Sequence, residues 1–221
     1  MTESTQTLGI IGGTGPEGRG LALRFARAGH RVIIGSRSAD RAIEAARQVG
    51  DQAEVEIAGA TNAEVAARSE TAILTIPYGG LRETLPPLAA PLAHKIVICA
   101  VAPIEFVDGR PVARRVEAGS AAEEARALLP NCRLVSAFQT VDSYRLQRPH
   151  MDRDTDVIIC SDDVDARRTV QTLASDLPGV RALSGGRLAA SRYVEECTAL
   201  LITINRIYRA HSGIRLTGVN R

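Results

Sequence analysis

Short apolar runs alternate with amphipathic segments along most of this chain. The amphipathic segments repeat hydrophobic residues at spacings of three and four, which predicts helices, whereas the uniformly apolar runs predict strands buried on both faces. The predicted strands are 8–11, 31–35, 54–58, 71–77, 95–100, 133–137, 156–160 and 180–183. The predicted helices are a segment that starts at the glycine turn and ends near 28, then 40–49, 61–68, 81–90, 121–129, a helix opened by 161–163, and 188–211. This alternation predicts an α/β fold with a mostly parallel sheet.

A glycine-rich turn joins the first predicted strand to the first predicted helix. It reads Gly13-Thr14-Gly15-Pro16-Glu17-Gly18 and matches the pattern G-x-G-x-x-G. In dinucleotide-binding folds the first glycine makes the turn, the second lets backbone approach a pyrophosphate, and the third lets helix and strand pack closely. Backbone N–H groups at the start of the helix then face the phosphates. The turn therefore favours nucleotide binding on a doubly wound Rossmann-type sheet; the alternative is a glycine turn with a purely structural role.

The end of the second predicted strand indicates which dinucleotide is bound. Folds that prefer NAD place an Asp or Glu there to hold the ribose hydroxyls, whereas this chain has Ser36-Arg37-Ser38, with Arg41 one helical turn further on. An arginine guanidinium pairs bidentately with a 2′-phosphate, which a carboxylate would repel. The two arginines predict a preference for NADP; the alternative is that both are solvated residues at the start of a helix.

Ligands of open α/β sheets bind beyond the carboxyl ends of the strands. Three segments that follow predicted strands are therefore candidates to border the cofactor. They are Ile76-Pro77-Tyr78, the apolar loop Val101-Ala102-Pro103, and a mixed polar and apolar segment that contains Gln139 and Thr140. The alternative for the first segment is a plain turn between strand and helix. Residues 105–119 show no periodicity, and we interpret them as a surface excursion.

Composition and charge exclude several classes of function. The chain has 221 residues, 45% hydrophobic and 24% charged, which is ordinary globular usage. Its net charge of +2 indicates no nucleic-acid or membrane surface, and no apolar run approaches the length of a spanning helix. The polar N-terminus has no signal-peptide core, and the four cysteines form no C-x-x-C pair. We interpret the cysteines as buried free thiols and expect a cytoplasmic protein without a metal site.

No acid–base or nucleophile constellation stands out in the sequence. The histidines are scattered, and the sequence identifies no partner for any of them: His30, His94, His150 and His211. Hydride transfer needs none, because the hydride moves from carbon to carbon and the cofactors carry the chemistry. The protein must hold two rings about 3–3.5 Å apart and exclude water, a role that suits small and apolar loop residues. We therefore predict no catalytic side chain, with Gln139 and Thr140 as ring contacts.

The last predicted helix carries more apolar surface than one face of a sheet usually needs. Its apolar positions recur at spacings of three and four and are Val194, Cys197, Leu200, Leu201, Ile204, Ile207 and Tyr208. Two interpretations remain open: a core helix, or a helix that lines a pocket and is shared with a second subunit. We divide the chain into an NADP-binding Rossmann domain, 1–183, and a C-terminal helical segment, 184–221, packed on it.

With these motifs the chain resembles, over nearly its whole length, the NADP-dependent reductases of the deazaflavin coenzyme F420. The residues that carry the resemblance are the Gly-Gly-Thr-Gly turn, Gly18, Gly20-Leu21-Ala22-Leu23-Arg24, Gly29-His30, Gly35-Ser36-Arg37, Leu74-Thr75-Ile76-Pro77, Ser191-Arg192 and Val194-Glu195. The family turn often carries Asn-Leu where this chain has Pro16-Glu17, and a histidine where it has Gln139. A glutamate near a pyrophosphate is unfavourable unless its side chain points to solvent.

The resemblance implies a homodimer in which NADP occupies the Rossmann half and the deazaflavin lies against the nicotinamide near the smaller C-terminal part. The residues that it places at the 2′-phosphate end are Thr14, Ser36, Arg37 and Arg41, and those near the reacting rings are Pro77, residues 101–103 and Gln139.

The function predicted first is hydride transfer between NADP(H) and coenzyme F420, which makes the chain an oxidoreductase. Arg145, Arg148 and Arg187 are candidates to bind the acidic tail of the coenzyme. One alternative is an NADPH-dependent reductase of a flavin, an imine or a keto substrate on the same scaffold. The other is a non-catalytic NADP-sensing protein.

Overall fold

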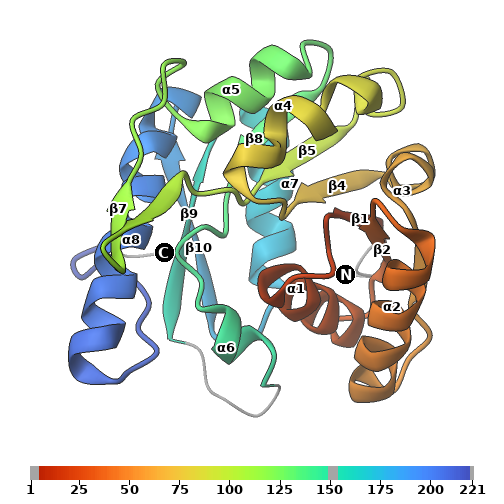
Figure 1. Cartoon of the computed structure of the whole chain (residues 1–221), viewed down its shortest axis with the longest axis horizontal. Coiled ribbons are helices and arrows are strands. Elements are labelled where there is room, and N and C mark those ends of the chain that lie inside the picture. Colours follow the sequence, from red (N-terminus) through yellow and green to blue (C-terminus); the bar gives the residue numbers. More distant parts are fainter. Residues whose placement is uncertain (1–4, 149–153, 220–221) are drawn as a thin grey trace.

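The computed structural model describes residues 5–148 and 154–219, and it confirms the predicted α/β architecture. In these residues an eight-stranded sheet has the order β10-β9-β8-β5-β4-β1-β2-β3, with helices on both faces (Figure 1). Neighbouring strands are parallel except β8 and β9, which meet antiparallel at Ser136 and Cys160. The strands are β1 (Thr7–Ile11), β2 (Arg31–Ser36), β3 (Ala58–Thr61), β4 (Thr71–Leu74), β5 (Ile96–Cys99), β8 (Arg133–Ser136), β9 (Thr155–Cys160) and β10 (Val180–Gly186).

Two hydrophobic layers cover the sheet, one on each face. In β1 the side chain of Ile10 belongs to the layer beneath α1, α2 and α7, whereas its neighbour Ile11 belongs to the layer beneath α3, α4 and α5. Because both faces are covered, the central strands are almost entirely apolar and buried. The helices are α1 (Pro16–Arg27), α2 (Ala39–Ala53), α3 (Asn62–Arg68), α4 (Leu81–Thr84), α5 (Ala121–Leu128), α6 (Ser143–Leu146), α7 (Val164–Ser175) and α8 (Ser191–Tyr208), with 3₁₀ turns η1 (Tyr78–Gly80), η2 (Pro86–Leu88) and η3 (Leu188–Ala190).

The strand order opens a crevice at the carboxyl end of β1. This strand pairs with β2 on one side and with β4 on the other. The chain therefore continues from β1 to β2 and β3 on one side, and then crosses to β4 on the opposite side of β1. Such a switch point is where open α/β sheets bind their ligands. The glycine turn and the ends of β4 and β5 border it.

Side-chain caps begin five of the described helices, α2, α3, α5, α6 and α7. Thr61 caps α3, and a full capping box forms with Glu64. Ser120 caps α5 by accepting from the Glu123 N–H (3.0 Å), and its hydroxyl donates to the Glu123 carboxylate (2.9 Å). Asp163 caps α7 by accepting from the Ala166 N–H (2.9 Å). The sequence can predict where these helices begin, because Ser, Thr and Asp side chains accept hydrogen bonds from the first N–H groups of a helix.

The strand predicted at 54–58 is wrong. Helix α2 continues to Ala53 and ends at Glu54, which adopts a left-handed conformation (φ 60°), and β3 begins only at Ala58. The alternation of charged and apolar residues at 54–57 is typical of a strand, but the strand forms instead from the small residues that follow, because these pack against α2. A Cβ at Gly59 would lie 2.4 Å from the backbone carbonyl carbon of Ala42, so only a glycine lets α2 lie this close to β3.

Two further predictions are wrong for local reasons. The helix predicted at 81–90 ends after one turn, because two prolines interrupt it; α4 stops at Thr84 and η2 starts at Pro86. The interpretation of 105–119 as an irregular excursion missed a hairpin of β6 (Ile104–Val107) and β7 (Arg110–Ala113). Its two-residue turn is Asp108-Gly109, both with positive φ (49° and 74°), a combination that favours a tight hairpin.

The C-terminal helix is shorter than predicted. It is preceded by η3 and ends at Tyr208, since Arg209 takes a left-handed conformation (φ 50°). Helix α8 lies beside β7 (Figure 1). Strand β10 reaches Gly186, so the division at 183/184 falls within a strand, and the separation into two units stays a prediction. Among the described residues no helix combines the length and apolar character needed to cross a bilayer.

Candidate functional site

A cleft of about 690 Å³ opens at the carboxyl ends of β1, β4 and β5. Its volume is typical of small-molecule sites, which measure about 300–1,000 Å³. Most residues predicted to bind a cofactor line it: Thr14, Gly15, Pro16, Glu17, Ser36, Arg37, Arg41, Ile76, Pro77, Tyr78, Val101, Ala102 and Gln139. We call the part formed by Thr14, Gly15, Ser36, Arg37 and Arg41 the β2 half, and the part formed by Glu17, Ile76, Val101, Gln139 and Thr198 the β5 half.

Each glycine of the turn meets a different constraint. The Gly13 N–H closes the turn on the carbonyls of Ile10 (3.2 Å) and Gly35 (2.8 Å). At Gly15 an added Cβ would meet nothing within 4 Å, so the space beside it is open. At Gly18 a Cβ would lie 2.5 Å from the Gly13 Cα, which requires a glycine where α1 packs on the turn. Gly13 and Gly18 therefore shape the cleft from beneath without lining it.

The β2 half is polar and exposed. The Arg37 and Arg41 side chains are both exposed, and in the described part of the chain neither forms an ion pair with a carboxylate. The Ser38 hydroxyl caps α2 by accepting from the Arg41 N–H (3.4 Å), and the Ser36 hydroxyl accepts from the Ser38 N–H (3.3 Å). Two unengaged guanidinium groups beside the start of a helix fit a phosphate dianion.

The β5 half is formed by segments from distant parts of the sequence. Phe138 takes a left-handed conformation (φ 76°) that packing holds in place, since its ring lies 5.9 Å from that of Phe25. Gln139 follows and donates through Nε2 to the Cys99 carbonyl (2.9 Å) and the Ser136 hydroxyl (2.7 Å). The Gln139 Oε1 is buried and has no hydrogen-bond partner in the described residues. This half therefore presents a fixed acceptor among apolar side chains.

Tyr78 forms a wall of the cleft without offering its hydroxyl to a ligand. The hydroxyl donates to the buried Glu124 carboxylate (2.7 Å), which also accepts from Arg82 (2.5 Å). Burial and this contact raise the pKa of Tyr78 to about 12, so the phenol is neutral at all physiological pH values. The ring of Tyr78 therefore contributes shape rather than acid–base chemistry.

Glu17 does not point fully into solvent, in contrast to what the sequence predicts for a glutamate near a pyrophosphate. It lines the β5 half, and its Oε1 is buried without a hydrogen-bond partner among the described residues. Burial raises the pKa of Glu17 to about 8, so the carboxyl is mostly protonated at neutral pH. Loss of charge, rather than exposure, makes a glutamate compatible with this position.

Of the lining residues outside the predicted set, three support the walls of the cleft through side-chain hydrogen bonds. The Asn62 Oδ1 accepts from the Gly12 N–H (3.1 Å) and so supports the glycine turn from α3. The Thr75 hydroxyl donates to the Ile11 carbonyl (3.2 Å), and the Thr198 hydroxyl donates to the Gln139 carbonyl (3.1 Å). Asn62 lies at the start of the helix predicted at 61–68, and Thr75 lies near the end of the strand predicted at 71–77. Both positions are at the ligand edge of the sheet, which could have identified them. The sequence carries no signal for the position of α8 that brings Thr198 to the cleft.

Besides Gly13 and Gly18, two predicted contacts lie outside the cleft, Thr140 and Pro103. Thr140 is buried, with 4% of its surface exposed, and does not line it. Pro103 faces a neighbouring cavity of about 1020 Å³ between the hairpin and α8. The charged residues that line this second cavity are Arg114, Arg115, Arg192, Glu117, Glu195 and Glu196.

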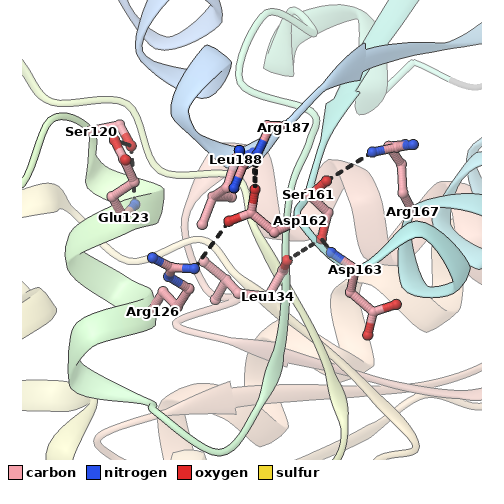
Figure 2. Close-up of polar contacts among 10 residues, drawn as sticks. All are labelled: Ser120, Glu123, Arg126, Leu134, Ser161, Asp162, Asp163, Arg167, Arg187 and Leu188. Carbon is pink, nitrogen blue, oxygen red and sulfur yellow. Dashed lines mark hydrogen bonds and ion pairs between the residues drawn. The ribbon is translucent and has the colours of Figure 1, made fainter.

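The three arginines predicted to bind an acidic tail also lie elsewhere. Arg187 pairs with Asp162 (3.1 Å), which in turn pairs with Arg126 (Figure 2). Arg148 stacks on the Tyr144 ring, 3.3 Å from its centroid. Arg145 lies on α6 and lines neither cavity. The ion pair with Asp162, on the loop after β9, therefore holds the exposed Arg187 away from both cavities.

Glu195 ties α8 to α5 behind the second cavity. Its carboxylate accepts from the N–H groups of Ala121 (2.8 Å) and Ala122 (3.1 Å) at the start of α5. Burial raises the pKa of Glu195 to about 7, although the two hydrogen bonds favour the charged form. The contact fixes the position of α8, from which Thr198 reaches the cleft.

Among the described residues, no histidine or cysteine lines the cleft. His30 pairs with Asp176 (3.0 Å) and His211 with Asp142 (3.2 Å), His94 adopts a left-handed backbone (φ 64°), and His150 lies outside the described residues. The cysteines are free, with Cys99 and Cys160 buried and Cys132 and Cys197 half-buried. In the described part of the chain no group of acidic, histidine and cysteine side chains is arranged to hold a metal ion.

Comparison with known proteins identifies a group of reductases. A family model for coenzyme F420-dependent NADP oxidoreductases matches residues 7–103. The chain is 39% identical to the F420-dependent NADP reductase of Methanothermobacter marburgensis over 96% of its own length and 98% of that protein. It is 36% identical to the enzyme of the same name from Methanocaldococcus jannaschii over 96% of this chain and 98% of that one. A crystal structure from Arthrobacter sp. FB24, provisionally described as an F420-dependent NADP-reductase, superimposes with a TM-score of 0.84 at 23% identity, covering 96% of this chain and 99% of that one.

Proposed function

Since the chain belongs to the F420-dependent NADP reductase family, we propose that it transfers a hydride between NADP(H) and the deazaflavin coenzyme F420. The observation that carries this proposal is the identity of 36–39% with named reductases along 96% of the chain, a span that includes both halves of the cleft. A reductase of imines shares only the fold, with 18% identity and a TM-score of 0.60. The sequence relationship therefore favours the deazaflavin over the alternative substrates.

The β2 half binds the 2′-phosphate and the pyrophosphate in this proposal. The unengaged guanidinium groups of Arg37 and Arg41 pair with the 2′-phosphate, assisted by the hydroxyls of Thr14 and Ser36. The open space at Gly15 lets the pyrophosphate approach the backbone. The charge of the β2 half also suits the 2′-phosphate, because the end of β2 carries no carboxylate that would repel it.

The β5 half binds the nicotinamide. The bound coenzymes supply the hydride chemistry, and the side chains position and shield them. The Gln139 Oε1 accepts from the carboxamide NH₂, which satisfies an oxygen that is otherwise without a partner. Ile76 and Val101 exclude water beside the ring, and the wall formed by Tyr78 limits its rotation. No group of the protein takes the hydride or forms a covalent bond.

The second cavity receives the deazaflavin tail. Coenzyme F420 has an acidic tail, and this cavity presents Arg114, Arg115 and Arg192 next to Pro103, alongside the acidic residues Glu117, Glu195 and Glu196. Because the loop 101–103 separates the two cavities, a ring held against the nicotinamide can extend its tail into the second one. This assignment replaces Arg145, Arg148 and Arg187 as the candidates for tail binding.

A homodimer is the expected assembly. An apolar surface remains exposed where α8 meets the hairpin; its residues are Phe106, Val107, Val112, Leu200, Ile207 and Tyr208. Exposed apolar patches of this kind are typical of interfaces. Light scattering at micromolar concentration should give the mass of a dimer, and Leu200→Glu should produce a monomer that keeps its circular dichroism spectrum. A monomeric wild-type protein would contradict the assembly without affecting the assigned reaction.

The reaction itself is tested by following the hydride. NADPH that carries deuterium at C4 should transfer it to coenzyme F420 without loss to water, because a carbon-bound hydride does not exchange. Initial rates should follow sequential kinetics, since both substrates occupy the cleft region together. FMN, FAD and a cyclic imine serve as competing acceptors. Turnover with one of these and none with coenzyme F420 would overturn the proposal, and tight NADPH binding without any turnover would indicate a sensor.

A further inference from the structure

Glu17 places a carboxyl group inside the β5 half of the cleft. It is the second residue of α1, after Pro16, and its Oε1 is buried without a hydrogen-bond partner among the described residues. Burying a carboxyl group without a partner is costly, and more so if the group is charged. An apolar residue such as the leucine of related turns would avoid this cost, so the carboxyl group requires an explanation that involves the bound nucleotide.

The neighbouring elements supply no cation to neutralise Glu17. On its own helix, Arg19 is directed away and donates to the Thr14 carbonyl (2.9 Å) and to the side chain of Gln48. On β5 the closest titratable group is the Cys99 thiol, whose pKa is raised by burial and also by the charges of Glu195 and Glu17, so it stays neutral. Burial alone accounts for the raised pKa of Glu17.

The remaining walls offer no proton donor or cation either. The Tyr78 hydroxyl is held by Glu124, and the Glu195 carboxylate by the N-terminus of α5. Glu83 on α4 is exposed at the rim. Arg37 and Arg41 lie on the β2 side of the glycine turn. The group that changes the charge next to Glu17 must therefore come from a ligand.

The nicotinamide is such a group, because its ring is positively charged when oxidised and neutral when reduced. An opposite charge within about 4–6 Å favours the ionised form of a carboxyl group by about 1–3 pKa units. Oxidised nicotinamide in the β5 half would therefore favour the carboxylate of Glu17, whereas reduced nicotinamide would leave the burial cost unopposed.

We propose that Glu17 distinguishes the two oxidation states of the bound nicotinamide by releasing a proton when NADP⁺ binds and retaining it when NADPH binds. The inference rests on the proposed function, because it needs the nicotinamide in the β5 half. In the step the carboxyl O–H bond breaks, the oxygen keeps the electron pair and the proton passes to solvent. When the hydride leaves NADPH with its electron pair, the ring gains its positive charge and the same proton is released; it returns when NADP⁺ dissociates.

Proton release can be measured without turnover. We suggest titrating the full-length protein with NADP⁺ and with NADPH by calorimetry at about pH 7, in two buffers that differ in ionisation enthalpy. Wild-type protein should release a large fraction of one proton with NADP⁺ and much less with NADPH. The difference should disappear in Glu17→Gln, which keeps the shape of the side chain, and in Glu17→Leu. Glu83→Gln is the matched control, since it removes a carboxyl group from the exposed rim, and it should behave as wild type.

The affinities supply a second measurement. Between about pH 6 and about pH 9 the affinity for NADP⁺ relative to NADPH should rise about tenfold or more in wild-type protein and stay flat in both Glu17 variants. The ratio cancels the titration of the phosphates, which both nucleotides share. A wild-type ratio independent of pH, or the same dependence in Glu17→Gln, would overturn the inference while leaving the reductase assignment intact. Failure of both nucleotides to bind wild-type protein would overturn the assignment and the inference together.

Discussion

The two halves of the cleft solve different physical problems. The β2 half is formed by one continuous β–α–β unit, and its arginines are exposed and without an ion-pair partner in the described residues. The β5 half brings together residues from α1, β4, β5, β8 and α8, and two of its side-chain oxygens are buried without partners. In the proposed reductase the first half binds the phosphate charges in contact with water, where salt screens them. The second half would bind the nicotinamide ring in a dry environment, where each polar group has a large effect.

This difference predicts that charge reversal in the β2 half has the largest effect on cofactor choice. Arg37→Asp should weaken NADPH binding about a hundredfold, because charge-assisted hydrogen bonds are each worth about 1.5–3 kcal/mol. NADH binding should barely change, and added salt should weaken NADPH more than NADH. Arg47→Asp on the outer face of α2, which disrupts only exposed ion pairs, is the control. An equal loss for both nucleotides would show that Arg37 does not contact the 2′-phosphate.

The glycine turn lies between the two halves, and substitutions at its glycines should distinguish effects on nucleotide binding from effects on stability. Gly15→Ala should leave the free energy of unfolding almost unchanged, because its Cβ meets nothing within 4 Å, yet weaken both nucleotides about tenfold or more by filling the space of the pyrophosphate. Gly18→Ala should lower the free energy of unfolding by about 1–3 kcal/mol, because its Cβ would lie 2.5 Å from the Gly13 Cα. Thermal melts and nucleotide titrations of the two variants check this. A Gly15→Ala protein that binds normally would place the pyrophosphate elsewhere.

Ionisation of Glu17 in the β5 half should make the stability of the nucleotide-free protein depend on pH. The pKa of Glu17 is raised in the folded state to about 8, so its contribution to stability is fully present below the unfolded pKa of 4.5 and is lost as the pH rises through 8. The difference in melting temperature between Glu17→Gln and wild type should therefore shift in favour of the variant from acid to alkaline pH. A difference that is independent of pH would mean that the carboxyl group is solvated and titrates normally.

The smallest effect is expected outside both halves. Arg187→Ala removes an exposed ion pair with Asp162 and should change the KM for coenzyme F420 less than about twofold, since such pairs are worth about 0–1 kcal/mol. Arg192→Ala in the second cavity should raise this KM about tenfold if the side chain holds the acidic tail. Steady-state kinetics with saturating NADPH compare the two. A larger rise in KM for Arg187→Ala than for Arg192→Ala would indicate that the tail binds at the loop after β9 instead.

Local signals account for what the sequence predicted well. The glycine turn, the arginines after β2 and the starts of the helices capped by Thr61, Ser120 and Asp163 each depend on neighbouring residues, and each lies close to where it was predicted. The hairpin at 104–113 was also readable from its Asp108-Gly109 turn, and it was missed because its strands are mostly exposed and lack a clear alternation. The strand at 54–58 failed because packing of α2 on Gly59, and not local propensity, decides where β3 begins.

The sequence by itself determined the dinucleotide fold, the preference for NADP and the family, since these depend on short motifs whose spacing fixes their geometry. The tertiary structure decided how the residues of the β5 half meet, and it placed Arg145, Arg148 and Arg187 outside the cleft. Gln139 and Thr198 are far apart in the chain and meet because α8 packs on the hairpin and is tied to α5 through Glu195 and Ser191. The protonation of Glu17 also belongs to the tertiary structure, because burial, which no local pattern encodes, is what raises its pKa.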